Sequence, residues 1–183
     1  MLIRLIESLV VFWCTVLMLR LFLQRGGLHI SHPLANLCAT LTNFVVRPAR
    51  KLIQPVKGWD MALVVIAFVC LLFIELAVVL YQVLYLNLPF NAISVLFAVG
   101  HTLLLLSVAM AYALIACLVV QMVLSFSDPY NPLMNTVSRV LYPLTRPFSF
   151  LRIGHFDFSG SVVFLALWLW VGAVVPYLRY FLH

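Results

Sequence analysis

Charged residues are scarce in this chain of 183 amino acids. Only 9% of its residues are Asp, Glu, Lys or Arg, whereas a soluble domain carries about 25%. Hydrophobic residues make up 66%, and the mean hydropathy is +1.16. Because so few charges cannot cover a globule in water, the composition predicts an integral membrane protein. The net charge of +6 is not gathered into a long basic face, so no nucleic-acid contact is expected.

The chain also lacks the motifs of common catalytic and metal sites. It contains no H-E-x-x-H, G-x-S-x-G or glycine-rich phosphate loop, and its four cysteines show no CxxC spacing. His101 stands at the start of an apolar run, and a metal role there would need partners that the sequence does not place. We therefore expect no enzyme activity, no catalytic residues, no cofactor and no metal site.

Four apolar runs are long enough to cross a bilayer, which takes about 20 residues as a helix. The first is too long for a signal peptide and contains Glu7 and Arg20, so it is expected to be a retained span. The predicted fold is an all-α membrane protein with four transmembrane helices, near Leu2–Leu23, Met61–Leu84, His101–Leu124 and Phe158–Tyr180.

A polar module separates the two spans of each half, and it occurs twice. Four residues of the first copy, 33–60, recur at a constant offset in the second copy, 132–157. Two helices per half return the chain to its starting side, so parallel tandem repeats are expected. The predicted division is residues 1–84, an uncharged connector over 85–100, and residues 101–183. Residues 93–99 either extend the third helix or lie in the interface, and the extension is favoured. The recurring pairs are Pro33 and Pro132, Asn36 and Asn135, Arg47 and Arg146, and Pro48 and Pro147.

Each module is expected to open with an amphipathic helix that lies in the membrane interface. Ser31 or His32 precedes Pro33, and Asn131 precedes Pro132, which is typical of an N-cap followed by proline at the first helical position. The helices are expected to end near Arg47 and Arg146, because prolines follow. Asp60 and Asp157 are expected to cap the next spans. In the first module the polar stripe is Asn36, Thr40, Asn43 and Arg47, and the apolar face is Leu34, Leu37, Leu41 and Val45. In the second module the polar stripe is Asn135, Arg139, Tyr142 and Arg146, and the apolar face is Leu133, Val137, Val140 and Leu144.

Two roles are open for the Arg-Pro dipeptides. They are basic anchors at the membrane surface, or Arg47 pairs with Asp60 or, across the halves, with Asp157. Most basic residues lie in the two modules, which by the positive-inside rule predicts cytoplasmic modules with both termini outside. The expected docking surface consists of Asn36, Arg47, Arg50 and Asp60 in the first module and Asn135, Arg139, Arg146 and Asp157 in the second.

The duplicated module resembles that of the YggT/YlmG family of small bacterial and plastid membrane proteins. The matching residues are Arg47, Pro48, Arg50, Lys51, Pro55, Gly58 and Asp60 in the first copy, and Asn131, Pro132, Tyr142, Pro143, Arg146, Pro147 and Asp157 in the second. His32, Phe44, Ser149 and Phe150 depart from the pattern. The resemblance implies a bacterial cytoplasmic (inner) membrane protein. It also implies roles such as envelope or osmotic stress tolerance, or assembly of other membrane proteins, without a defined reaction.

Charges inside the spans bear on an alternative function. Glu75 lies in the middle of the second span, where an ionisable group must face a partner or water. Glu7 is expected to pair with Arg4, and Arg20 to reach the interface. The sequence thus favours a non-enzymatic assembly, stabilisation or stress-tolerance factor that acts through its modules. Its expected partners are the lipid bilayer and other membrane proteins or a second copy of itself. The alternative is an ion channel or transporter component with Glu75 in the path.

Overall fold

The computed structural model describes residues 2–29, 32–56, 58–86, 91–128, 130–153 and 156–182. Long helices dominate this part of the chain, in the order α1 (Leu2–Gly26), α2 (Pro33–Ala49), α3 (Met61–Leu86), α4 (Ala92–Ser127) and α5 (Pro132–Thr145). A 3₁₀ turn, η1 (Arg146–Leu151), and a two-stranded antiparallel ribbon, β1 (Arg152–Ile153) and β2 (Phe156–Asp157), follow. The chain ends in α6 (Ser159–Leu169), the π-helical turn η2 (Trp170–Val174) and α7 (Val175–Leu182).

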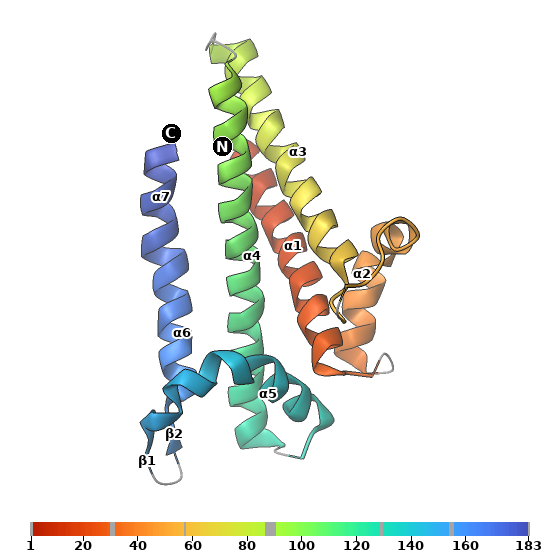
Figure 1. The fold of residues 1–183 in the computed structure, drawn as a ribbon, viewed down its shortest axis with the longest axis vertical. Coiled ribbons are helices and arrows are strands. Elements are labelled where there is room, and N and C mark those ends of the chain that lie inside the picture. Colours follow the sequence, from red (N-terminus) through yellow and green to blue (C-terminus); the bar gives the residue numbers. More distant parts are fainter. Residues whose placement is uncertain are drawn as a thin grey trace.

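Among the described residues, four helices are long and apolar enough to cross a membrane: α1, α3, α4 and the continuous run from α6 to α7. The chain is therefore an all-α, multi-pass membrane protein, as predicted. The third span begins at Ala92, which confirms that residues 93–99 extend this helix. At 36 residues, α4 is longer than a bilayer requires, and together with α3 it extends past both chain termini at one end of the bundle (Figure 1).

The four spans are packed unequally. Helices α1, α3 and α4 contact one another, while the α6–α7 run packs mainly on α4. Figure 1 shows α6 and α7 on the side of α4 away from α3. Only 11% of the apolar window of this last span is buried, against 44% for α4. Most of its surface is therefore available to lipid.

Both module helices, α2 and α5, lie at the same end of the bundle (Figure 1). One apolar core joins α1, α3 and α4 through residues such as Leu17, Leu63 and Ala109. A second core lies over α5 and joins it to α4 and α6 through residues such as Val137, Leu118 and Val163. The second module helix is thus built into the bundle.

The predicted starts of the module helices are confirmed. Pro33 and Pro132 occupy the first helical positions, and the preceding His32 and Asn131 cap the helices with their side chains. His32 Nδ1 accepts a hydrogen bond from the Leu34 amide at 3.3 Å. Asn131 Oδ1 accepts one from the Leu133 amide at 3.0 Å. Ser31 lies outside the described residues.

The observed ends of the module helices, Ala49 and Thr145, lie within two residues of the predicted Arg47 and Arg146, and they differ in detail. Helix α2 does not stop at Arg47 but continues through Pro48 to Ala49, because a proline this near the C-terminus costs only one intrahelical hydrogen bond. Helix α5 ends at Thr145, and Arg146 leads into the 3₁₀ turn instead of an irregular stretch. Asp157 does not cap the fourth span; its backbone lies in β2, and Phe158 is the N-cap residue.

Candidate functional site

The first module helix, α2, has three faces. Cys38, Thr42 and Val46 are buried against the bundle. The predicted apolar face is exposed: Leu37 retains 58% of its surface and Leu41 47%. In a bilayer this leucine face is available to lipid. The helix packs on the bundle through the separate face that carries Cys38, Thr42 and Val46. The polar stripe residues Asn36 and Arg47 are exposed on the third face.

An Arg–Asp pair does close the first module, but Arg50 supplies the guanidinium. Arg50 Nε donates to Asp60 Oδ2 at 2.8 Å, and its Nη2 contacts the same oxygen. The predicted pairing of Arg47 with Asp60 is therefore wrong. Since α2 runs through Pro48, Arg50 becomes its C-cap residue, and the chain returns from there to Asp60. The Asp60 carboxylate, which was expected to cap α3, forms this pair with Arg50.

The return of the chain to α3 is a tight turn braced by Arg25. Val56 and Trp59 exchange backbone hydrogen bonds at 3.0 and 2.9 Å, and Gly58 between them has φ +80°. A side chain would be strained at this φ, and its Cβ would lie 2.9 Å from Arg25 Nη1. The Arg25 guanidinium carbon lies 5.4 Å from the centre of the Trp59 ring, within cation–π range.

Arg20 is a buried cation that joins α1 to α2. It is 6% exposed, and its Nη1 donates to Thr42 Oγ1 at 2.6 Å. Thr42 Oγ1 in turn donates to the Cys38 carbonyl at 2.6 Å. The expectation that Arg20 reaches the surface is therefore wrong. A buried guanidinium is costly without partners, which makes this position functionally interesting.

A cavity of about 260 Å³ lies between α1 and α2 beside Arg20. Arg47 and Arg50 also line it, together with Asn43 and Cys38. Burial raises the pKa of the Cys38 thiol, and the nearby Arg20 cation opposes this shift. With three guanidinium groups and Asp60 as the neighbouring carboxylate, the cavity favours an anionic group.

The second module helix, α5, uses its faces differently. Its apolar face is buried, with Leu133 4% and Val137 1% exposed. The stripe residues Asn135, Arg139 and Arg146 are exposed. The Asp157 side chain lies outside what the structure describes. The same pattern of leucines and valines thus packs inside the protein in α5 and lies on the outside in α2.

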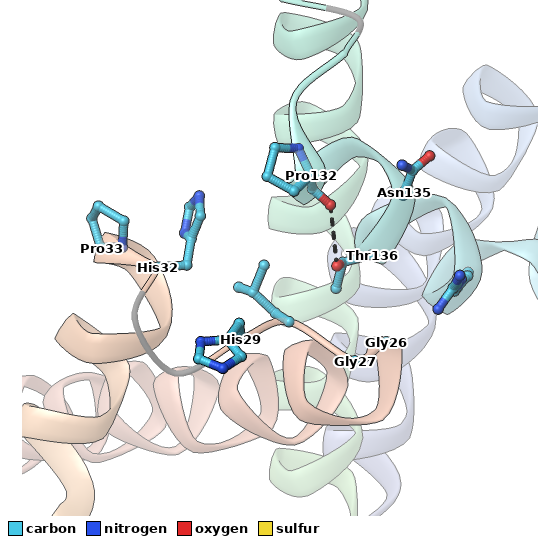
Figure 2. Close-up of a pocket in the computed structure, with 10 residues that line it drawn as sticks. Gly26, Gly27, His29, His32, Pro33, Pro132, Asn135 and Thr136 are labelled. Carbon is cyan, nitrogen blue, oxygen red and sulfur yellow. Dashed lines mark hydrogen bonds between the residues drawn. The ribbon is translucent and has the colours of Figure 1, made fainter.

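A groove of about 480 Å³ lies between the starts of the two module helices (Figure 2). Its walls include His32 and Pro33 from the first module and Asn135 and Arg139 from the second. The end of α1 forms its floor, where a Cβ at Gly26 would lie only 2.7 Å from the Thr136 carbonyl oxygen. Only glycine permits this close approach, so the groove depends on it.

A second polar cluster lies inside the bundle. His101 Nδ1 of α4 lies 2.6 Å from Glu75 Oε2 of α3, and their side chains are 13% and 6% exposed. Glu7 of α1 pairs with Arg179 of α7 instead of the expected Arg4. The buried Glu75 Oε1 has no hydrogen-bond partner among the described residues. The four titratable groups of this cluster come from four different helices.

Comparison with known protein families finds a similarity in the first half of the chain. Residues 1–82 match the CCB3/YggT family. This segment contains α1, the whole first module and most of α3. The first half of the chain is therefore similar to this family. No curated protein and no solved structure matches the chain.

The YggT segment holds the part of the predicted site that the structure brings together. Arg47 and Arg50 line one cavity, Asp60 pairs with Arg50, and Asn36 lies apart on the exposed stripe. Arg20 and Thr42 were not predicted as site residues. An arginine inside an apolar run was the available signal, but its partner 22 positions away could not be read from the sequence.

Proposed function

We propose that this YggT-type protein is a non-enzymatic factor that assembles or stabilises other membrane proteins, or supports envelope and osmotic stress tolerance. It resides in the bacterial cytoplasmic membrane with both modules on the cytoplasmic face. The observation that carries the proposal is the cavity beneath α2, lined by Arg20, Arg47 and Arg50. We propose that an acidic segment of a partner protein binds there.

The chemistry of the cavity supports an acidic partner. Guanidinium groups present paired donors that match a carboxylate, and such charge-assisted hydrogen bonds are stronger than neutral ones. Arg50 already contacts Asp60, whereas Arg47 is exposed at the rim. Arg47 is therefore the side chain best placed to recognise an incoming anion.

The test is charge reversal followed by in-cell crosslinking and purification in mild detergent. Arg47→Glu should remove one acidic protein from the crosslinked set, and adding Arg146→Glu should remove any partner held by the second module. Lys51→Glu is the matched control, because Lys51 is exposed and does not line the cavity. An unchanged crosslinking pattern in Arg47→Glu would refute the proposal. Loss of co-purified anionic lipid alone would reassign the cavity to lipid binding.

The proposed organisation is two parallel repeats, residues 1–84 and 101–183, joined by the connector 85–100. Its support is that α2 and α5 both begin with a side-chain cap and a proline, and lie at the same end of the bundle. Single-cysteine variants at Thr40 and Arg139, both exposed, should be labelled from the cytoplasmic side only. Labelling of the two sites from opposite sides would exclude parallel repeats.

The buried Glu75–His101 pair favours one second candidate, an ion channel or transporter component involved in osmotic balance. If Glu75 lies in the path, Glu75→Gln should abolish ion flux into proteoliposomes without loss of expression. Asp128→Asn, which changes an exposed carboxylate, is the control. Flux that survives Glu75→Gln, or no flux with the unmodified protein, would remove this candidate.

A further inference from the structure

Three residues with metal-binding side chains converge inside the bundle from three helices. Glu7 of α1, Glu75 of α3 and His101 of α4 each offer a ligand atom, and these atoms all lie within 4.8 Å of one another. We propose that these residues bind a divalent transition-metal ion, with Zn²⁺ as the best match. The site is separate from the cavity and groove of the modules, so it stands independently of the docking function.

The ligand set suits zinc. Imidazole nitrogen and carboxylate oxygen are both zinc ligands, and three protein ligands with one open position form a recurring type of zinc site. In a tetrahedral site with bonds near 2.0–2.1 Å, neighbouring ligand atoms are about 3.4 Å apart. The cluster therefore has to readjust, because the His101 Nδ1–Glu75 Oε2 pair at 2.6 Å is closer than this and the 4.8 Å limit of the cluster is wider. The two glutamates can supply this through their side-chain torsions, because their carboxylates lie at the ends of flexible chains.

The buried glutamate provides a second, independent observation. Glu75 is 6% exposed, its Oε2 faces His101, and its Oε1 has no hydrogen-bond partner among the described residues. An acceptor buried in an apolar span without a partner is unfavourable. A metal ion among the three side chains would satisfy this oxygen, for which the described residues offer no partner.

The charges near the site limit what it can hold. Arg179 of α7 contacts Glu7 Oε1 and neutralises one carboxylate. Two carboxylates, one guanidinium and a neutral imidazole sum to one negative charge. A divalent ion reverses this to one positive charge, and ionisation of a metal-bound water would bring the sum to zero. A divalent ion therefore leaves the cluster close to neutral.

The site lies toward the chain ends in α1 and α7 and at about the middle of α3. Glu7 is five residues from the start of α1, or about 8 Å along the helix, and Arg179 is in the last turn of α7. An ion thus enters from the side where the two chain ends lie (Figure 1). Because the ligands come from α1, α3 and α4, the ion would link three spans.

The test measures metal binding directly. Protein without a histidine tag, purified in mild detergent and stripped with a chelator, is titrated with Zn²⁺, and bound metal is counted by mass spectrometry. We expect one Zn²⁺ per chain. Glu75→Gln and His101→Gln should each weaken binding by at least about tenfold, as loss of a ligand requires. His29→Gln and Asp128→Asn, which change exposed residues outside the cluster, should bind as the unmodified protein does.

A second measurement covers variants that fail to fold. Co²⁺ added to the unmodified protein should give the intense visible absorption of a four-coordinate site, and Zn²⁺ should displace it. If the unmodified protein holds no stoichiometric Zn²⁺, or Co²⁺ gives only the weak spectrum of the hydrated ion, the proposal is overturned. Equal binding by the unmodified protein and His101→Gln overturns it as well.

Discussion

The contact between Gly26 and α5 predicts how strongly the first half depends on the second module. Gly26 is buried at the end of α1. A methyl group added there would lie 2.5 Å from Thr136 Cγ2 and 2.7 Å from the Thr136 carbonyl oxygen. The second of these contacts is with backbone, so no change of side-chain rotamer relieves it. Gly26→Ala must push α5 away from α1.

The expected cost follows from overpacking. Inserting a methyl group into a packed site typically costs about 1–3 kcal/mol, and a backbone contact places Gly26→Ala at the upper end. For a chain of this length, 1 kcal/mol shifts the melting temperature by about 2–4 °C, so we expect a Tm lower by about 4–10 °C. The assay is thermal unfolding in detergent, monitored by fluorescence and by size-exclusion recovery.

Gly172→Ala is the matched control, because a Cβ at Gly172 has nothing within 4 Å. Replacing a helical glycine by alanine in open space should leave the protein unchanged or stabilise it by up to about 1 kcal/mol. Thr136→Ala combined with Gly26→Ala should recover only part of the loss, since the carbonyl contact persists. If Gly26→Ala and Gly172→Ala have the same Tm, α1 and α5 are not packed as described.

Three further predictions concern the modules and their surroundings. Arg20→Met should lower the free energy of unfolding by about 1.5–3 kcal/mol, because it removes a buried charged hydrogen bond. Arg4→Met, which changes an exposed arginine, should leave the free energy of unfolding unchanged. Equal stability of the two variants would contradict the buried role of Arg20. Asn131→Ala should cost about 1 kcal/mol because it removes an N-cap, and an unchanged Tm would show that the cap contributes little. Because burial raises the pKa of Cys38, its thiolate fraction at a given pH is lower than that of an ordinary thiol. Maleimide labelling of Cys38 should therefore rise only at a more alkaline pH than for an exposed cysteine, and equal pH profiles would contradict this.

The features of the fold that were predictable are those encoded in local sequence. A span is recognised from about 20 successive apolar residues, and a helix start from a capping residue before a proline; both signals lie within a few positions of what they specify. The apolar run of α4 and the capping of α5 by Asn131 follow from such signals, whereas the start of α4 at Ala92 lies nine residues before the span expected from His101. The passage of α2 through Pro48 does not, because one lost hydrogen bond near a helix end is tolerated when the helix is packed.

The partners inside the bundle were not predictable, because they depend on how distant helices meet. Glu7 and Arg4 are three residues apart and satisfied the local rule for a helical pair, yet Glu7 contacts Arg179 at the far end of the chain. Glu75 was recognised as costly in a span, but His101 became its partner only through the packing of α3 on α4. A periodic pattern gives the face on which a residue lies, and it does not say which helix packs there.

The two module helices carry the same sequence pattern but have different surroundings, and this difference indicates a structural role for α5 and a binding role for α2. Helix α5 packs on α1, α4 and α6, so it lies between the two halves, and its apolar face is used by the core. Helix α2 packs mainly on α1 and α3 at the edge of the bundle, and its leucine face stays exposed. Arg50 and Lys51 are also present only in the first copy, since Ser149 and Phe150 replace them in the second. Substitutions in α5 should therefore act mainly on stability, and those at the rim of α2 mainly on binding.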